Sequence, residues 1–313
     1  MRDPAIIRLL PDGRRLHLND GPIDLIIEAD GPATAVRAAY ESAARRFVII
    51  LDELCAELPL LRSRATQSSS QPRGPIARTM SAAVRPYCEQ HFITPMAAVA
   101  GAVAEAVLAE MTGAADLERA YVNNGGDIAL HLCGRRCYTL GMIERPDSRT
   151  LFGSVEVSGA SSVRGVATSG WRGRSFSLGI ADAVTVLAET AAQADAAATI
   201  IANAVDLPGH PAVIRVPASE IAPDSDLGAI PVTREVAPLS LPEIDAALRR
   251  GLLLAESLRE RRLIHSAALY LQGRTALLSQ ATADTFFCSD RLLSPPVIDS
   301  TIPHDTQRSP HHA

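Results

Sequence analysis

The sequence contains no lysine, so all 30 of its basic residues are arginine. This absence excludes Schiff-base catalysis, a phosphate-loop lysine and a serine–lysine dyad, because each of them depends on a lysine amine. Aromatic residues are also scarce, at 4% of the chain, which leaves little material for a platform that stacks on a ring. Trp171 and Tyr121 are the candidates for such a contact.

The five cysteines form no paired framework, and their odd number indicates a reducing compartment. Cys133 and Cys137 have the spacing C-x-x-x-C, whereas metal and redox motifs usually have C-x-x-C. We therefore interpret these two as the ends of two facing strands beside a turn.

The charge and hydropathy patterns exclude further classes of protein. A net charge of −5 gives no global positive field that would attract nucleic acid. The first ten residues lack the long apolar core of an export signal. The apolar stretch 94–111 is interrupted by Gly101, Glu105 and Glu110 and falls short of a membrane span, so we expect a buried helix there. These features predict a cytoplasmic protein without nucleic-acid or membrane partners.

Several elements are expected from local patterns. Residues 5–30 are typical of two strands, at 6–10 and 23–28, and a helix should follow at 33–58. Within that helix, the β-branched segment 47–51 leaves a strand open as the alternative. Residues 206–243 are expected to be irregular around one short strand. Further helices are predicted at 76–90, 95–111 and 243–262, further strands at 127–132, 137–144, 151–157 and 163–168, and a hairpin at 263–278.

The stretch from Ala120 to Leu130 concentrates turn residues between strand-like apolar residues. Two adjacent glycines can reach positive φ and approach a ligand closely. Asn and Asp tolerate left-handed conformations and can satisfy turn amides. A tight hairpin and a ligand-binding turn are both consistent with this stretch, whose turn is formed by Asn123, Asn124, Gly125, Gly126 and Asp127.

A second stretch, Gly165 to Ala188, is typical of a strand, a small-residue turn and then a helix start. Asp182 would lie in the first turn of that helix, which should run to about Val205 and stop at Pro208-Gly209. The alternative role of Asp182 is to stabilise the positive end of its own helix.

The motifs Asn-Asn-Gly-Gly-Asp-Ile, Ala-Thr-Ser-Gly and Ala-Asp-Ala together resemble the ApbE-like superfamily of flavin transferases, in particular a shortened branch without established activity. In that family these elements line the site for a flavin dinucleotide and a magnesium ion. The resemblance covers roughly residues 75–280. It implies an α+β fold in which two similar sheet-and-helix halves, with mixed or antiparallel sheets, surround one cleft. It also implies cofactor contacts from Asn124, Gly125, Gly126, Asp127, Thr168, Ser169 and Gly170.

The resemblance further implies that Mg²⁺ is held by a helix aspartate and a threonine four positions later. Position 186 is a valine here, and the nearest hydroxyl after Asp182 belongs to Thr185, so Asp182 and Thr185 are the candidate metal ligands. The family's His-Ile-x-Asp-Pro-x-Thr-Gly segment is missing from residues 171–180, and we assign no catalytic residue. Candidates to meet phosphate groups are Arg164, Arg172 and Arg174.

We expect one domain over residues 1–293, with a flexible loop at about 59–75 and a disordered tail at 294–313. The favoured function is binding of FAD, FMN or a similar phosphate-bearing cofactor, with Mg²⁺-dependent group transfer as the associated activity. Two alternatives stay open. One is a cofactor-binding or assembly module without transferase activity, and the other is an enzyme acting on a different pterin- or nucleotide-like molecule. The oligomeric state is also open, a homo-oligomer included.

Overall fold

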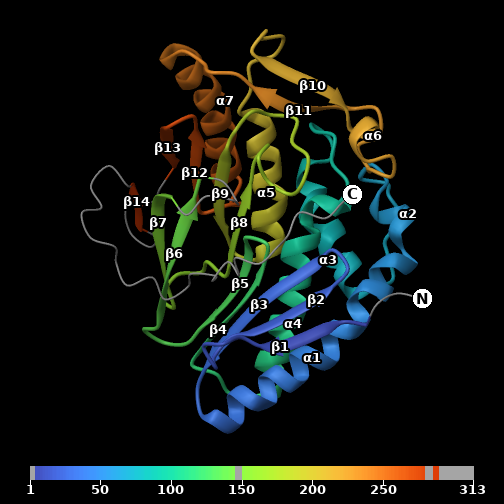
Figure 1. Cartoon of the computed structure of the whole chain (residues 1–313), viewed down its shortest axis with the longest axis vertical. Helices are drawn as coiled ribbons and strands as arrows, with labels where there is room; N and C mark the ends of the chain where they lie inside the picture. Colours follow the sequence, from blue (N-terminus) through green and yellow to red (C-terminus); the bar gives the residue numbers. More distant parts are fainter. Residues whose placement is uncertain (1–3, 145–149, 279–284, 289–313) are drawn as a thin grey trace.

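The computed structural model describes residues 4–144, 150–278 and 285–288 (Figure 1). The predicted tail at 294–313 lies outside these residues. The elements, in chain order, are β1 (Ile6–Leu9), β2 (Leu16–Asp20), β3 (Ile23–Asp30), α1 (Ala33–Ala56), α2 (Leu58–Leu61), α3 (Pro75–Val84), η1 (Arg85–Tyr87), η2 (Pro95–Ala98), α4 (Val99–Ala114), β4 (Arg119–Asn124), β5 (Asp127–Leu132), β6 (Cys137–Ile143), β7 (Leu151–Ser158), β8 (Gly165–Ser169), β9 (Ala183–Ala188), α5 (Ala191–Ala204), β10 (Val213–Pro217), α6 (Ala218–Ile221), β11 (Pro231–Val236), α7 (Leu241–Glu260), β12 (Ser266–Leu271), β13 (Arg274–Leu278) and β14 (Thr285–Cys288).

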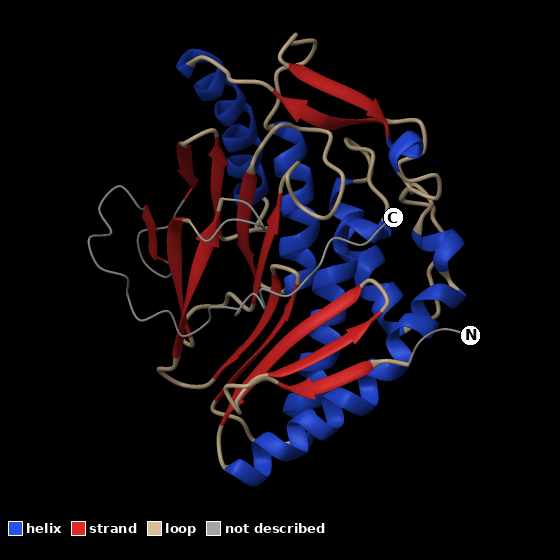
Figure 2. Ribbon diagram, in the orientation of Figure 1, coloured by secondary structure: helices blue, strands red, loops and turns tan. Residues whose placement is uncertain are grey.

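A nine-stranded antiparallel sheet forms the centre of the molecule (Figure 2). Its strand order is β1-β2-β3-β4-β5-β8-β9-β12-β13. Helices α1 and α4 pack on the part formed by β2 to β5, and α5 and α7 pack on the part formed by β8, β9, β12 and β13. The fold is therefore α+β, with two similar sheet-and-helix halves, as the motif resemblance implied.

The two halves meet along a short seam. Only two residue pairs, Ile128↔Val166 and Ala129↔Gly165, join β5 to β8. On the helical face, the start of α5 lies close to one glycine of α4 and one glycine of β8. A Cβ at Gly101 would lie 2.3 Å from the carbonyl oxygen of Ala191, and a Cβ at Gly165 would lie 2.1 Å from the carbonyl carbon of Thr190. The absence of a side chain at both positions lets the start of α5 enter the seam.

The other face of the sheet is covered by a smaller sheet with the order β14-β7-β6. Apolar residues of this sheet, including Tyr138, Val155 and Val157, pack on Leu130 and Leu187 of the central sheet. Strand β9 is consequently buried on both faces, by helices on one side and by the smaller sheet on the other.

This double burial explains the main error of the sequence analysis. Residues 183–188 form a strand, whereas we predicted a helix from Asp182 to about Val205. The apolar run has no alternation, because both faces need apolar side chains. The helix begins only at Ala191, after Thr190, whose hydroxyl accepts a hydrogen bond from the Gln193 amide at 3.3 Å.

Other predictions were right in kind and differ in their boundaries. Residues 5–30 contain three strands instead of two, since β2 follows the turn after β1. Residues 206–243 contain a second strand, β11, which pairs with β10, and the short helix α6. The strand predicted at 127–132 coincides with β5.

One segment of the described chain, Pro95–Ala114, is long and apolar enough to cross a membrane by length and composition, contrary to our expectation that it falls short. In the structure its helix α4 packs on α1, α5, β4 and β5. Val103, Val107 and Met111 are fully buried there. The apolar character of this segment is thus accounted for by its place in the core.

Candidate cofactor and cation site

The two-glycine turn closes the hairpin of β4 and β5. Gly125 and Gly126 have φ values of 66° and 112°. Residues with a side chain adopt such values only at a cost, so the turn favours glycine at both positions. The amide of Gly126 donates to the side-chain oxygen of Asn123 at 2.9 Å. Asn124 is buried and donates from Nδ2 to the carbonyl of Ala100 at 3.2 Å. The turn is therefore attached to the beginning of α4.

The three turns singled out in the sequence lie at the same end of the central sheet. The backbone amide of Thr168 donates to Oδ1 of Asp127 at 3.3 Å, which joins the end of β8 to the two-glycine turn. Ser169 is paired with Val184. A Cβ at Gly170 would lie 2.3 Å from the carbonyl oxygen of Asp182, so these two segments also touch.

The carboxylate of Asp182 is fully engaged. Its Oδ1 accepts from Trp171 Nε1 at 3.1 Å and from Arg172 Nε at 2.7 Å, and its Oδ2 accepts from the Gln272 amide at 2.7 Å. It lies at the beginning of β9, so it does not stabilise a helix terminus as the alternative interpretation supposed.

Thr185 is not brought together with Asp182. Residues three positions apart in an extended chain direct their side chains to opposite faces. The Thr185 hydroxyl instead lies 2.9 Å from the Thr168 hydroxyl on the neighbouring strand. The assignment of Asp182 and Thr185 as metal ligands stays a prediction, and this geometry does not favour it.

A different aspartate, Asp195, accompanies the two-glycine turn. It lies on α5, and its Oδ2 accepts from the amide of Gly101, in the first turn of α4, at 3.0 Å. The first amides of a helix have no partner within the helix and carry the positive end of its dipole. They therefore stabilise a carboxylate at this position.

Asp195 is not among the candidates predicted from the sequence, although the sequence contains a signal for it. The motif resemblance implies a helix aspartate followed four positions later by a threonine. On the helix that the structure contains, Asp195 and Thr199 have this spacing and share one helix face. The signal was overlooked because the start of the helix was placed at Asp182.

The carboxylates of Asp127 and Asp195 are near enough for the charge of Asp127 to raise the pKa of Asp195. Burial, opposed in part by the Thr168 amide and Arg174, raises the pKa of Asp127 to about 7. Burial, followed by the charge of Asp127, raises the pKa of Asp195 well above its ordinary value. Two like charges in a partly desolvated space disfavour each other's ionisation, and a cation between them would relieve that repulsion.

The three candidate arginines differ in what they contact. Arg164 donates to backbone carbonyls of its own loop, including that of Ser161 at 2.6 Å, and Arg172 is paired with Asp182. Arg174 is exposed, donates from Nη2 to the carbonyl of Pro22 at 2.8 Å, and places Nη1 3.0 Å from where a Cβ at Gly125 would lie. Of these three side chains, Arg174 is the one located over the two-glycine turn.

The aromatic candidates do not both lie at this end of the sheet. Tyr121 packs edge-on against Tyr138 with ring centroids 5.6 Å apart, in the core between the two sheets. The guanidinium of Arg172 lies over the ring of Trp171, with its Cζ atom 4.3 Å from the ring centroid.

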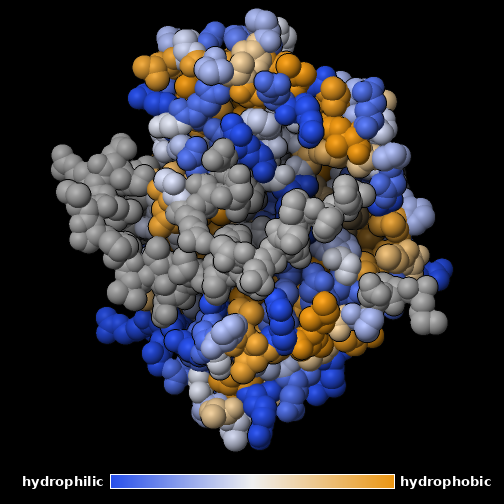
Figure 3. Space-filling model, viewed as in Figure 1, coloured by the Kyte–Doolittle hydropathy of each residue, from blue (hydrophilic) through white to orange (hydrophobic). Residues whose placement is uncertain are grey.

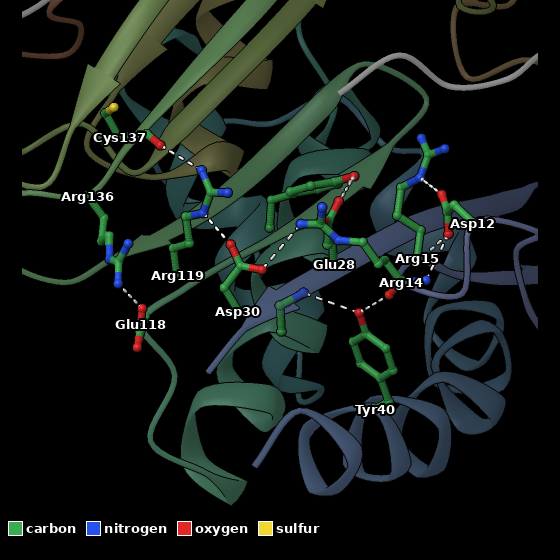
Figure 4. Close-up of polar contacts among 12 residues, drawn as sticks. Asp12, Arg14, Arg15, Glu28, Asp30, Tyr40, Glu118, Arg119, Arg136 and Cys137 are labelled. Carbon is green, nitrogen blue, oxygen red and sulfur yellow. Dashed lines mark hydrogen bonds and ion pairs between the residues drawn. The ribbon is translucent and has the colours of Figure 1, made fainter. Parts of the chain in front are cut away.

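A second polar cluster lies at the opposite end of β3 and β4 (Figure 4). Arg119 donates to Asp30 at 2.5 Å and to the carbonyl of Cys137 at 3.0 Å, while Arg14 pairs with Glu28 at 2.6 Å. A cavity of about 440 Å³ lies beside Arg14 and Asp30. Because these opposite charges are paired with each other, the cluster mainly ties β3, β4 and β6 together.

The surface at this end of the molecule is mixed in character (Figure 3). Edge strand β1 exposes Ile6, Ile7 and Leu9, with between 39% and 54% of each residue accessible. Polar residues lie between such apolar ones on the face in view.

The fold and the site together define an α+β protein with a carboxylate pair and a two-glycine turn at the seam between two halves. Comparison with known families identifies the class. The chain belongs to the family described as AbpE bacteria, which matches residues 7–277. This match confirms the resemblance that the motifs indicated.

Individual relatives are archaeal proteins named UPF0280. The chain is 36% identical over 184 residues to the UPF0280 protein MK0206 of Methanopyrus kandleri, covering 58% of this chain and 69% of that one. It is 41% identical over 135 residues to the UPF0280 protein of Methanothermobacter thermautotrophicus, covering 42% of this chain and 49% of that one. The second match therefore spans about half of that relative's length.

Among solved structures, the apo form of the flavinyl transferase ApbE of Pseudomonas stutzeri matches with 13% identity and a TM-score of 0.37. The match covers 89% of this chain and 96% of that chain.

Proposed function

We propose that this protein binds FAD, FMN or a related phosphate-bearing cofactor at the seam, over the two-glycine turn, with a divalent cation held between Asp127 and Asp195. The observation that carries the proposal is the carboxylate pair itself. Two half-buried acidic side chains from separate elements, β5 and α5, lie beside a turn whose backbone can be approached closely at Gly126. An arrangement of this kind is costly without a cation.

The donor set fits magnesium. The described residues contain no group of three or more His, Cys, Asp or Glu side chains suited to a metal. Mg²⁺ commonly uses one or two carboxylates and completes its octahedron with water and phosphate oxygens. Asp127 and Asp195 would supply the carboxylates, and Thr199 is in position on the same helix face to add a hydroxyl. The bound cation would neutralise charge on the phosphates.

The remaining parts of the site would orient the ligand. A phosphate can approach the backbone at Gly126 closely, where no side chain stands in the way, and the exposed guanidinium of Arg174 can pair with it. Thr168, Ser169 and Gly170 border the same space at the end of β8. In this proposal the protein binds and orients the cofactor, while the cofactor supplies the reactive group.

Group transfer by the bound cofactor forms part of the proposal, and a binding module without turnover is the second candidate. The latter is favoured by the segment Trp171–Ile180, which contains no histidine to accept or donate a proton. A cytoplasmic location also belongs to the proposal. It is supported by Cys55, Cys88, Cys133 and Cys137, which are free thiols in the described part of the chain.

Thermal-shift screening tests binding. The purified protein is titrated with FAD, FMN, ADP and a pterin, each with and without Mg²⁺. A ligand at a hundred times its Kd stabilises the folded state by about 2.7 kcal/mol, so a rise in Tm of several degrees is expected with FAD and Mg²⁺. Release of FMN from FAD, followed by chromatography, separates turnover from binding alone.

Asp195→Asn tests the cation site. The variant should lose the Mg²⁺-dependent part of the shift while staying folded, because the substitution also removes the repulsion between the two carboxylates. Asp116→Asn, at an exposed position, is the matched control and should behave as wild type. A normal Mg²⁺ effect in Asp195→Asn together with its loss in Asp182→Asn would refute our site and restore the assignment made from the sequence.

A further inference from the structure

We infer that Asp182 is a positioning residue for Arg174: it anchors the arch formed by residues 171–175 and so holds the Arg174 guanidinium over the two-glycine turn. The expected effect on ligand binding rests on the proposed function. The anchoring of the arch by Asp182 does not, and it can be tested without any ligand.

The anchor is a buried carboxylate with three donors. The side chain of Asp182 is only 3% exposed, and it accepts from Trp171, from Arg172 and from the backbone of Gln272. A carboxylate is removed from water at a large cost unless its oxygens are hydrogen-bonded. These contacts satisfy it while fixing two consecutive residues of the arch.

The anchor extends beyond the arch. The side chain of Gln272, in the turn between β12 and β13, accepts from the Leu239 amide at 2.9 Å and donates to the carbonyl of Ala237 at 3.0 Å. Asp182 therefore connects the arch to the β12–β13 turn and, through Gln272, to the segment that follows β11. Because the attachment point of the arch is connected to several elements, the arch is held rigidly.

The arch itself is short. The Trp171 amide donates to the carbonyl of Ala181 at 3.0 Å, and the Gly173 amide donates to that of Gly170 at 3.0 Å. Only Gly173 separates the anchored Arg172 from Arg174. The Arg174 side chain then crosses from the second half to the first, where it contacts the carbonyl of Pro22 and lies beside Gly125.

Asp182→Asn tests the arch without ligand. The amide keeps the size of the side chain but loses the ion pair with Arg172, so the arch should detach more often. Trypsin cleavage after Arg174 should accelerate by about tenfold, since cleavage follows the population of the open form. The exposed turn at Arg135 and Arg136 lies outside the arch, and its cleavage rate should not change.

The protein contains one tryptophan, Trp171, which reports on the same event. Its emission should shift to longer wavelength in Asp182→Asn. Asp30→Asn is the matched control, because Asp30 is also paired with an arginine but lies at the other end of β3. Should Asp182→Asn fold poorly, Arg172→Gln breaks the same ion pair from its exposed side and should give the same selective cleavage after Arg174.

A double-mutant cycle tests whether Asp182 acts through Arg174. With ADP and Mg²⁺ as the probe, Asp182→Asn and Arg174→Ala should each weaken binding roughly three- to tenfold, and the double variant should be no weaker than Arg174→Ala. Additive losses would overturn the positioning role, as would unchanged cleavage and emission in ligand-free Asp182→Asn. If the wild-type protein binds none of the probes, the proposed function fails, while the cleavage and emission results still decide whether Asp182 anchors the arch.

Discussion

Replacement of Gly101 by alanine tests the packing that forms the site. A Cβ at this position would lie 2.3 Å from the carbonyl oxygen of Ala191, 2.4 Å from its carbonyl carbon and 2.6 Å from the amide nitrogen of Ala192. All three are backbone atoms, so no side chain can rotate to make room. Because ordinary contacts begin at 3.4 Å, α4 and α5 would have to separate locally by roughly 1 Å.

The magnitude follows from two opposing effects. Overpacking of this kind costs roughly 1–3 kcal/mol, and a backbone obstacle places Gly101→Ala near the upper end. Alanine is favoured over glycine in a helix by up to about 1 kcal/mol. We therefore expect a net loss of about 2 kcal/mol in the free energy of unfolding. At an unfolding entropy of about 2 cal/mol/K per residue this corresponds to a decrease of roughly 3–4 °C in Tm.

Gly113→Ala is the matched control on the same helix, since a Cβ at Gly113 meets nothing within 4 Å. It should be neutral or stabilising by up to about 1 kcal/mol. Urea unfolding followed by circular dichroism and Trp171 fluorescence measures both variants. Gly101→Ala should also reduce the Mg²⁺-dependent shift, because separation of α4 from α5 withdraws the Gly101 amide from Asp195. Equal stability of the two variants would refute the close contact between the helices.

Two further predictions concern stability. Burial raises the pKa of Asp127 to about 7, so protonation of this carboxyl favours the folded state. Its contribution to the free energy of unfolding is fully present below the ordinary carboxyl pKa and is lost as pH rises through about 7. Denaturant unfolding across this range should show the loss in wild type without Mg²⁺ and a flatter profile in Asp127→Asn; parallel profiles would contradict the assignment. Ser240→Ala should lower the free energy of unfolding by about 1 kcal/mol. The reason is that the Ser240 amide and hydroxyl both donate to Glu243 at 2.7 Å at the start of α7. An unchanged Tm would contradict a stabilising role of this cap.

The sequence was sufficient to predict a structural element where the residue types in it favour one conformation. The two glycines between Asn124 and Asp127 could be assigned to a turn because positive φ is inexpensive only for glycine, and that turn closes the β4–β5 hairpin. The apolar stretch 94–111 could be assigned to a buried helix from its charged interruptions and its Thr94-Pro95 start. The motif combination also identified the family before any fold was known.

Tertiary structure decided the elements whose sequence is ambiguous. Strand β9 carries no alternation, since layers on both of its faces demand apolar side chains, and a uniform apolar run does not distinguish a strand from a buried helix. The start of the helix was misplaced for this reason. Asp182 was consequently predicted to be the helix aspartate, whereas Asp195 is an aspartate that lies on the helix.

The sequence by itself determined the turn, the family and the types of residue that could meet a phosphate. It could not determine which carboxylates become neighbours, because Asp127 lies on β5 of one half of the fold and Asp195 lies on α5 of the other. They meet only where Gly101 and Gly165 let α5 approach α4 and β8. Proximity across that seam depends on packing between elements distant in sequence, and no local pattern encodes it.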